Sequence, residues 1–225
     1  ILLIGFFLFK EAFQIFYQAG FFKVILGGSW YPTYDPPKFG MFPFILGTLS
    51  VTALTAVIAI PLGLATAIYI AELASFRMKE FLKPLIEMLA SFPSVVLGFF
   101  GMVVIAPILS SWLSPLIADR LPEVLKNTGL PFISTYLADF CHDRLFITSG
   151  LNMFTAALML TVRAIPVISS IAEDALTAVP RTYREASYSL GAGQWQTIWR
   201  VVIPSAVSGI SVAVILGIGA IIGET

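Results

Sequence analysis

The sequence is poor in charge and has one cysteine, and each shortage argues against a class of protein. Only 12% of its 225 residues are charged, whereas a soluble domain carries about 25%. A soluble globular domain is therefore disfavoured. The single cysteine, Cys141, cannot form an internal disulfide. The formal net charge of zero gives no indication of a nucleic-acid partner.

Motifs of catalysis and metal binding are also missing. No G-x-x-x-x-G-K-[ST] motif occurs, so the chain is not expected to hydrolyse ATP itself. His142 is the only histidine, and no nucleophile–base pair is evident, which argues against an enzyme. The segment DFCHD, Asp139 to Asp143, lacks the ligand spacing of a metal site. No internal repeat supports the inverted-repeat architecture of many secondary transporters.

Long apolar runs are abundant instead, since 58% of the residues are hydrophobic. A helix that spans the bilayer needs about 20 apolar residues, and five segments meet or approach that length. They are Ile1 to about Phe9, Phe44–Ala71, Phe92–Trp112, Leu145–Ala172 and Ala206–Thr225. The short alternating strands of a membrane β-barrel are not seen. The sequence therefore predicts an all-α, polytopic membrane protein with one domain over residues 1–225.

Both ends of the sequence look truncated. The run ILLIGFFLF is too short to span unless more apolar chain precedes it, and GIGAIIGET stops while the helix should still be in lipid. We expect at least one further span after Thr225, so that about five of six transmembrane helices are present.

The loops between the spans do not fix the orientation. If the chain alternates sides, loops Glu72–Ser91 and Glu173–Ser205 share one face, and loops Lys10–Pro43 and Leu113–Arg144 share the other. Each face then carries six Lys and Arg residues, so the positive-inside rule does not decide. Prolines within or beside the spans predict helix breaks or kinks that packing or a cavity must satisfy; they are Pro61, Pro93, Pro107 and Pro166.

One polar stretch, YREASYSLGAGQWQTIWRVVIP, is more elaborate than a connector requires. Thr182 and Glu185 form a T-x-x-E pattern that predicts a capping box after Pro180. Gly191 is a natural stop. The pattern predicts a short helix over about Tyr183–Leu190.

This short helix would present one stripe of side chains, Tyr183, Ala186, Ser187 and Leu190. Ala186 and Ser187 are small enough to let a partner approach the backbone. In a second helical run, Trp195 and Trp199 lie one turn apart. The residues alone leave two interpretations open, an amphipathic segment on lipid or a rigid knob for a cytoplasmic partner.

The same stretch resembles the EAA loop of ABC-importer permeases, whose pattern is E-A-A, three residues, G, nine residues, I-x-L-P. The matching positions here are Glu185, Ala186, Ser187, Gly191, Val201, Ile203 and Pro204. The resemblance implies that the short helix is a coupling helix that docks in a groove of an ATPase subunit. It also implies that residues 180–204 form a cytoplasmic loop.

Further segments resemble the PstC type of phosphate-importer permease across nearly the whole chain: FGMFPFILGTLSVT, AIPLGLATAIYIAEL, ASFPSVVLGFFG, IAEDALTAVPRTYREAS and GIGAIIGET. The resemblance implies the type I ABC-importer permease fold in the inner membrane. It also implies a heterodimer with a PstA-like permease, a cytoplasmic ATPase dimer that binds ATP and Mg²⁺, and an extracytoplasmic phosphate-binding protein. No cofactor is expected on this chain.

Two ionisable residues lie inside predicted spans, Arg163 and Glu224, and intramembrane charge is a default sign of function. The resembling family usually has an Arg four residues before the Glu, where this chain has Ala220. One interpretation is that Arg163 supplies that charge, serving an anion path or pairing with Glu224. The alternatives are a structural ion pair or an arginine that snorkels to the interface. Ser91 and Ser94, which flank Pro93, are further candidates for the path.

Two other functions remain open. The same machinery could carry another oxyanion, such as sulfate or molybdate. A channel or ion-coupled carrier could use Arg163 and Glu224 without ATP, although this leaves the EAA-like loop unexplained.

Overall fold

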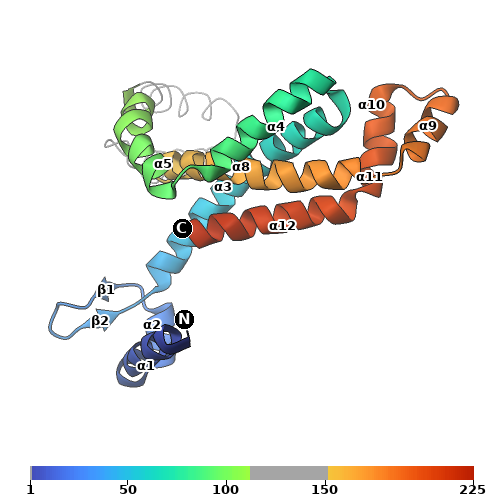
Figure 1. The fold of residues 1–225 in the computed structure, drawn as a ribbon. Coiled ribbons are helices and arrows are strands. Elements are labelled where there is room, and N and C mark those ends of the chain that lie inside the picture. Colours follow the sequence, from blue (N-terminus) through green and yellow to red (C-terminus); the bar gives the residue numbers. More distant parts are fainter. Residues whose placement is uncertain (1, 112–151) are drawn as a thin grey trace, which may run out of the picture. The chain divides into compact units, whose positions relative to one another are not determined.

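A computed structural model describes residues 2–111 and 152–225, and these are almost entirely helical (Figure 1). The chain divides into two compact units, residues 1–50 and 51–225. The whole loop Leu113–Arg144, which includes Cys141 and His142, lies outside the described residues.

The first unit holds two helices and a small hairpin. Helix α1 (Leu2–Ala19) ends at Gly20, whose φ of 84° suits glycine, and α2 (Phe21–Leu26) follows. Strand β1 (Trp30–Tyr31) pairs antiparallel with β2 (Lys38–Phe39), with Trp30 opposite Phe39. The Trp30 ring meets Phe39 and Phe44 edge-on, at centroid distances of 5.9 and 5.7 Å. These aromatic contacts stabilise a hairpin too short to be stable alone.

Four helices in the described part of the chain are long and apolar enough to cross a membrane. They are α3 (Phe42–Ile68) with the π-helical turn η1 (Tyr69–Leu73), the helix of residues Ser94–Ser111, α8 (Met153–Thr177) and α12 (Val207–Glu224). The Ser94–Ser111 helix begins with α5 (Ser94–Phe100) and the π-helical turn η2 (Gly101–Ile105). The predicted all-α, multi-span architecture is confirmed, and the first predicted segment is helical but is not among these four.

Helix α8 is the centre of the second unit. In its apolar stretch 39% of residues are buried, compared with 11–28% in the other three spans. Helix α12 lies along α8 (Figure 1), and the chain reverses between them, so the two are antiparallel. Ile168 of α8 is fully buried, and its side chain fits against Gly63 of α3 and Gly217 of α12. A Cβ atom at Gly63 would lie 2.8 Å from Cγ2 of Ile168, so the contact requires glycine.

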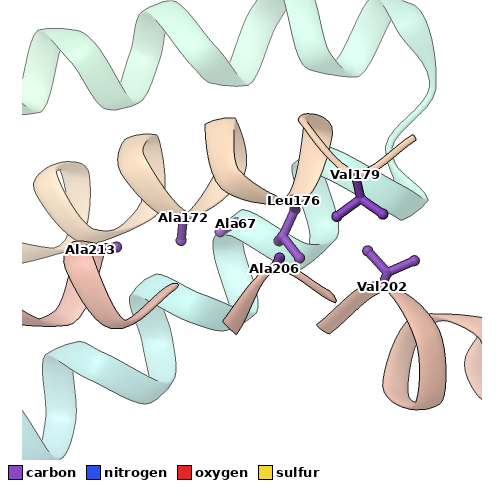
Figure 2. Close-up of a cluster of buried hydrophobic side chains, with 7 residues drawn as sticks. All are labelled: Ala67, Ala172, Leu176, Val179, Val202, Ala206 and Ala213. Atoms are coloured by element: carbon purple, nitrogen blue, oxygen red, sulfur yellow. The ribbon is translucent and has the colours of Figure 1, made fainter. Parts of the chain in front are cut away.

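A second cluster of small and branched side chains joins the helices near one end of the unit (Figure 2). Its buried members are Ala67, Ala172, Leu176, Val179, Val202, Ala206 and Ala213. They come from α3, α8, α12 and the segments that flank the polar loop. The loop therefore begins and ends on a packed core.

The loop between α3 and the third span contains helix α4 (Phe76–Ser91), which packs against α8. Lys83 Nζ lies 3.0 Å from a Glu173 carboxylate oxygen and 3.7 Å from Asp174. The hydrogen bond to Glu173 raises the pKa of Lys83 above its usual 10.5, although partial burial opposes this. Lys83 is therefore a protonated tether between α4 and α8 at neutral pH.

The prolines have different effects. Pro61 and Pro166 lie inside α3 and α8, where the helices continue past them. Pro93 separates two helices instead, because α4 ends at Ser91 and α5 begins at Ser94. Phe92, the residue before this proline, has an extended backbone with ψ 131°, the conformation that a following proline favours, so the helix ends here.

Candidate functional site

The polar loop between α8 and α12 folds as a short helix followed by a helical return. Helix α9 covers Arg181–Ser189, two residues earlier than expected, and its N-cap is Pro180. The predicted capping box is wrong, because no side chain caps this end and Thr182 lies inside the first turn. Pro180 starts the helix at φ −58°, within the range that its ring imposes.

The end of α9 is as predicted. Leu190 is the C-cap and Gly191 adopts φ +82°, a left-handed conformation that favours glycine. The Gly191 N–H donates to Tyr188 O at 2.9 Å, and the Ala192 N–H donates to Ser187 O at 3.2 Å. These two bonds form a Schellman motif, which satisfies the last carbonyls of the helix and reverses the chain.

The stripe of four side chains divides into an exposed and a buried part. Tyr183, Ala186 and Leu190 are exposed, as is Glu185. Ser187 is buried, and its hydroxyl lies 2.9 Å from that of Thr197 in the return segment. Ser187 therefore holds the two halves of the loop together and does not belong to a surface that a partner can reach.

The return segment is amphipathic. It runs through α10 (Gln194–Thr197), the π-helical turn η4 (Ile198–Val202) and α11 (Ile203–Ser205). Ile198 and Val202 are fully buried, whereas Trp195 and Trp199 are 59% and 61% exposed. The two tryptophans therefore share one outer face, as their spacing predicted.

An ion pair that the sequence analysis missed joins this loop to the end of α3. Arg184 Nη2 donates to Glu72 Oε1 at 2.6 Å, and Arg184 Nε lies 3.2 and 3.3 Å from the two carboxylate oxygens. The same guanidinium donates to the main-chain oxygens of Leu176 (2.9 Å) and Val179 (2.7 Å). The side chains of Arg184 and Glu72 are only 17% and 9% exposed.

The sequence contains a feature at each residue of this pair, but neither feature indicates that the two residues are in contact. Glu72 is an acidic residue directly after an apolar run, and Arg184 is the basic residue on the inner side of α9. They are 112 positions apart, so no local spacing links them. Their contact confirms that loops Glu72–Ser91 and Glu173–Ser205 share one end of the helices.

The two intramembrane charges form a second ion pair. Arg163 Nη2 of α8 lies 2.7 Å from Glu224 Oε1 of α12, and the side chains are 33% and 25% exposed. They line a cavity of about 340 Å³ together with Ala90, Ala220 and several apolar residues. The pairing with Glu224, one of the predicted alternatives, is confirmed.

Ser91 and Ser94 do not line this cavity. Both are exposed, and the Ser91 hydroxyl donates to Met88 O at 2.7 Å within its own helix. The structure therefore does not bring the two serines together with Arg163 and Glu224. In residues 2–111 and 152–225, no cluster of His, Cys, Asp or Glu could hold a metal ion.

Comparison with known proteins gives a family match over most of the second unit. Residues 59–225 match the family described as the binding-protein-dependent transport system inner membrane component. This stretch includes α8, the polar loop and α12. No solved structure matches the chain.

Several curated relatives are similar to the chain. The probable ABC transporter permease protein YqgH of Bacillus subtilis is 36% identical over 87% of this chain and 53% of its own length. The phosphate transport system permease protein PstC of Mesorhizobium japonicum is 32% identical over 97% of this chain and 62% of its own length. PstC 1 of Mycobacterium tuberculosis is 33% identical over 83% and 52%. The chain thus spans half to three-fifths of the relatives it matches.

Proposed function

Because the chain belongs to the family of binding-protein-dependent transport system inner membrane components, we propose that it is the membrane-spanning subunit of an ATP-driven phosphate importer. The observation that carries this proposal is the family match across α8, the polar loop and α12, together with relatives whose names specify phosphate transport. The energy comes from hydrolysis of ATP, which binds with Mg²⁺ to a separate ATPase, and we expect no cofactor on this chain.

Helix α9 is the element that contacts the ATPase in this proposal. Its exposed residues Tyr183, Glu185, Ala186 and Leu190 form the surface available to a partner. Ser187 and Gly191 act differently, because one binds Thr197 and the other ends the helix. The loop then faces the cytoplasm, and the protein is a multi-pass protein of the cell (inner) membrane.

The Arg163–Glu224 pair lies on the proposed translocation path. A guanidinium 2.7 Å from a carboxylate presents little net charge, so an incoming phosphate must compete with Glu224 for Arg163. The adjoining cavity of about 340 Å³ has room for a small anion. An ATP-driven movement of α8 against α12 would separate the pair and free Arg163. Ser91 and Ser94 remain proposed path residues outside this cavity.

The proposed assembly has three kinds of partner. A PstA-like permease completes the membrane part, an ATPase dimer binds α9, and an extracytoplasmic binding protein delivers phosphate on the far side, where we place loops Lys10–Pro43 and Leu113–Arg144. The lipid bilayer covers the remaining apolar surfaces of the spans, of which Phe99 (63% exposed) and Ile215 (67%) are examples.

The decisive experiment is reconstitution of the full-length protein with its candidate permease, ATPase and binding-protein partners in proteoliposomes. We expect labelled phosphate to enter only when ATP is present on the ATPase side, and an ATPase variant without its Walker A lysine to abolish uptake. Sulfate and molybdate serve as matched substrates. Uptake of sulfate or molybdate in place of phosphate would show that the importer carries that oxyanion instead. Phosphate uptake without the ATPase would show that the protein is an ion-coupled carrier.

A further inference from the structure

The contact between Glu72 and Arg184 joins elements that the chain itself does not connect. The polar loop is continuous with α8 at one end and with α12 at the other, so a force on α9 passes to these two helices through the backbone. Helix α3 has no such connection to the loop. Glu72, in the π-helical turn at the end of α3, supplies it through a side chain.

The geometry of this contact is suited to carrying movement. All three guanidinium nitrogens of Arg184 are used, by the Glu72 carboxylate and by the carbonyls at the end of α8. A planar group held in several directions cannot rotate without losing a charged hydrogen bond. Because both side chains are largely buried, water compensates poorly for a broken bond.

The return segment of the polar loop also contacts Glu72. Gln194 of α10 donates from Nε2 to the main-chain oxygen of Glu72 at 3.3 Å. Ser187 and Thr197 bind the two halves of the loop to each other, so the loop contacts Glu72 as one body. Beneath it, Ala67 of α3 packs in the same cluster as Val179 and Val202.

We propose that Glu72 and Arg184 form a transmission link that makes the end of α3 move together with α9 during the transport cycle. The two are positioning residues, which act through the coupling helix and do not touch ATPase or phosphate. This inference rests on the proposed function for its role in transport. The contact between Glu72 and Arg184 does not depend on the proposed function, and whether it is kept in every nucleotide state can be measured separately.

The first test is a double-mutant cycle in the reconstituted full transporter. Glu72→Gln and Arg184→Gln should each lower the phosphate imported per ATP hydrolysed by about tenfold, and the double variant should lose no more than either single one. A multiplicative loss in the double variant, or unchanged coupling in Glu72→Gln, would overturn the link. A role in folding alone would lower the amount of complex and leave the ratio of phosphate to ATP unchanged, which also counts against it.

Two further variants guard against misfolding and general damage. Arg184→Lys keeps the charge but cannot reach the carboxylate and two carbonyls at once, so it should also uncouple transport. Glu173→Gln is the matched control, because it removes the charge from the 3.0 Å pair with Lys83, which joins α4 to α8 and includes no residue of α3 or α9. It should keep the wild-type ratio, and an equal loss in this control would show that the effect is not specific.

A distance measurement separates the link from the proposed function. Spin labels at Ala74→Cys and Ser189→Cys, in a full complex whose other cysteines, Cys141 among them, are replaced by serine, report the separation between the end of α3 and α9. We expect one narrow distance in all nucleotide states and a broad distribution after Glu72→Gln. A distance that changes with nucleotide in the otherwise unaltered protein would refute the link. A wild-type complex that imports no phosphate would refute the proposed function. The spin-label distances would still show whether the end of α3 and α9 move together.

Discussion

In residues 2–111 and 152–225, two arginines are neutralised by glutamates, but their surroundings differ. Arg184 uses all three nitrogens and is 17% exposed, whereas Arg163 makes one close contact with Glu224 and is 33% exposed beside a cavity. A guanidinium fixed on several sides is suited to hold a geometry, and one with free donors can exchange its partner. The first pair is therefore structural in character, and the second has the freedom that an anion site requires.

At this scale we expect Arg163→Ala to reduce phosphate uptake at least about tenfold while the complex still assembles. The variant removes the only cationic side chain that lines the described cavity, and it leaves the Glu224 carboxylate unpaired. Uptake of labelled phosphate in proteoliposomes and the yield of purified complex are the two measurements.

Two further variants show how the result of Arg163→Ala should be interpreted. Arg163→Ala combined with Glu224→Gln removes the stranded charge, so recovery of uptake would mean that Arg163 only neutralises Glu224. Thr161→Val is a control on the same helix, because the Thr161 hydroxyl bonds only to Ala157 O at 2.8 Å within α8. Normal uptake in Arg163→Ala itself would contradict a role in the path.

The sequence revealed Arg163 and Glu224 because a charge within an apolar run is conspicuous at a single position. Glu72 and Arg184 were not found, since each stands at the border of a polar loop where charge is ordinary. What distinguishes them is burial and mutual contact across 112 positions, and these depend on how α3 and α9 pack. Residue type can be judged from sequence alone, but partners distant in sequence cannot.

At the scale of the element, helix α9 combines a predicted end with an unpredicted beginning. Gly191 ends it because a left-handed residue is needed for the Schellman bonds, and that requirement is visible in the sequence. The T-x-x-E pattern predicted a helix start at Thr182, but Pro180, two residues earlier, is the N-cap and the helix begins directly after it. The inward position of Ser187 depends on Thr197 in another helix, which periodicity within α9 does not reveal.

We expect Gly191→Ala to loosen the end of α9, because a left-handed conformation costs a residue with a side chain about 1–2 kcal/mol. Amide hydrogen exchange in the last turn of α9 should accelerate about 5- to 30-fold, and coupling of ATP hydrolysis to uptake should fall. Gly193→Ala is the matched control, since Gly193 has φ −74° and no atom would lie within 4 Å of its new Cβ. Equal exchange rates in both variants would contradict the assigned role of Gly191.

At the scale of the whole molecule, four apolar helices were predictable because the bilayer demands long runs. The bounds of three agree with the prediction to within about two residues, whereas the span expected at Leu145–Ala172 begins at Met153 and ends at Thr177. The arrangement of α3, α8 and α12 was not predictable. Gly219 and Gly223 have the G-x-x-x-G spacing that is typical of close helix packing, but nothing described lies within 4 Å of a Cβ built on either. Gly63 and Gly217 make the close contacts instead, because Ile168 projects between them.

This packing predicts that Gly217→Ala destabilises the three-helix arrangement by about 1–3 kcal/mol, the usual range for overpacking. The new methyl group would collide with Cγ1 and Cδ1 of Ile168. Thermal unfolding of the purified protein in detergent is the measurement, and Gly219→Ala on the same helix is the control with open space around its Cβ.

The same contact offers a rescue. Ile168→Ala removes the colliding atoms, so it should destabilise the protein alone but partly restore stability when combined with Gly217→Ala. If the two losses simply add, Ile168 is not the obstacle and the close approach of α8 to α12 is not what Gly217 provides.

The pairing of Arg163 with Glu224 also bears on how the protein is made. Arg163 is synthesised 61 positions before its partner (224 minus 163), so α8 meets the membrane with an uncompensated cation. An arginine at the centre of a span opposes insertion by about 2.5–3.5 kcal/mol on translocon scales. We therefore expect α8 to wait at the insertion machinery until α12 has been translated and the two can enter the lipid as an antiparallel hairpin. The polar loop between them would then be formed at the moment of insertion and not after it.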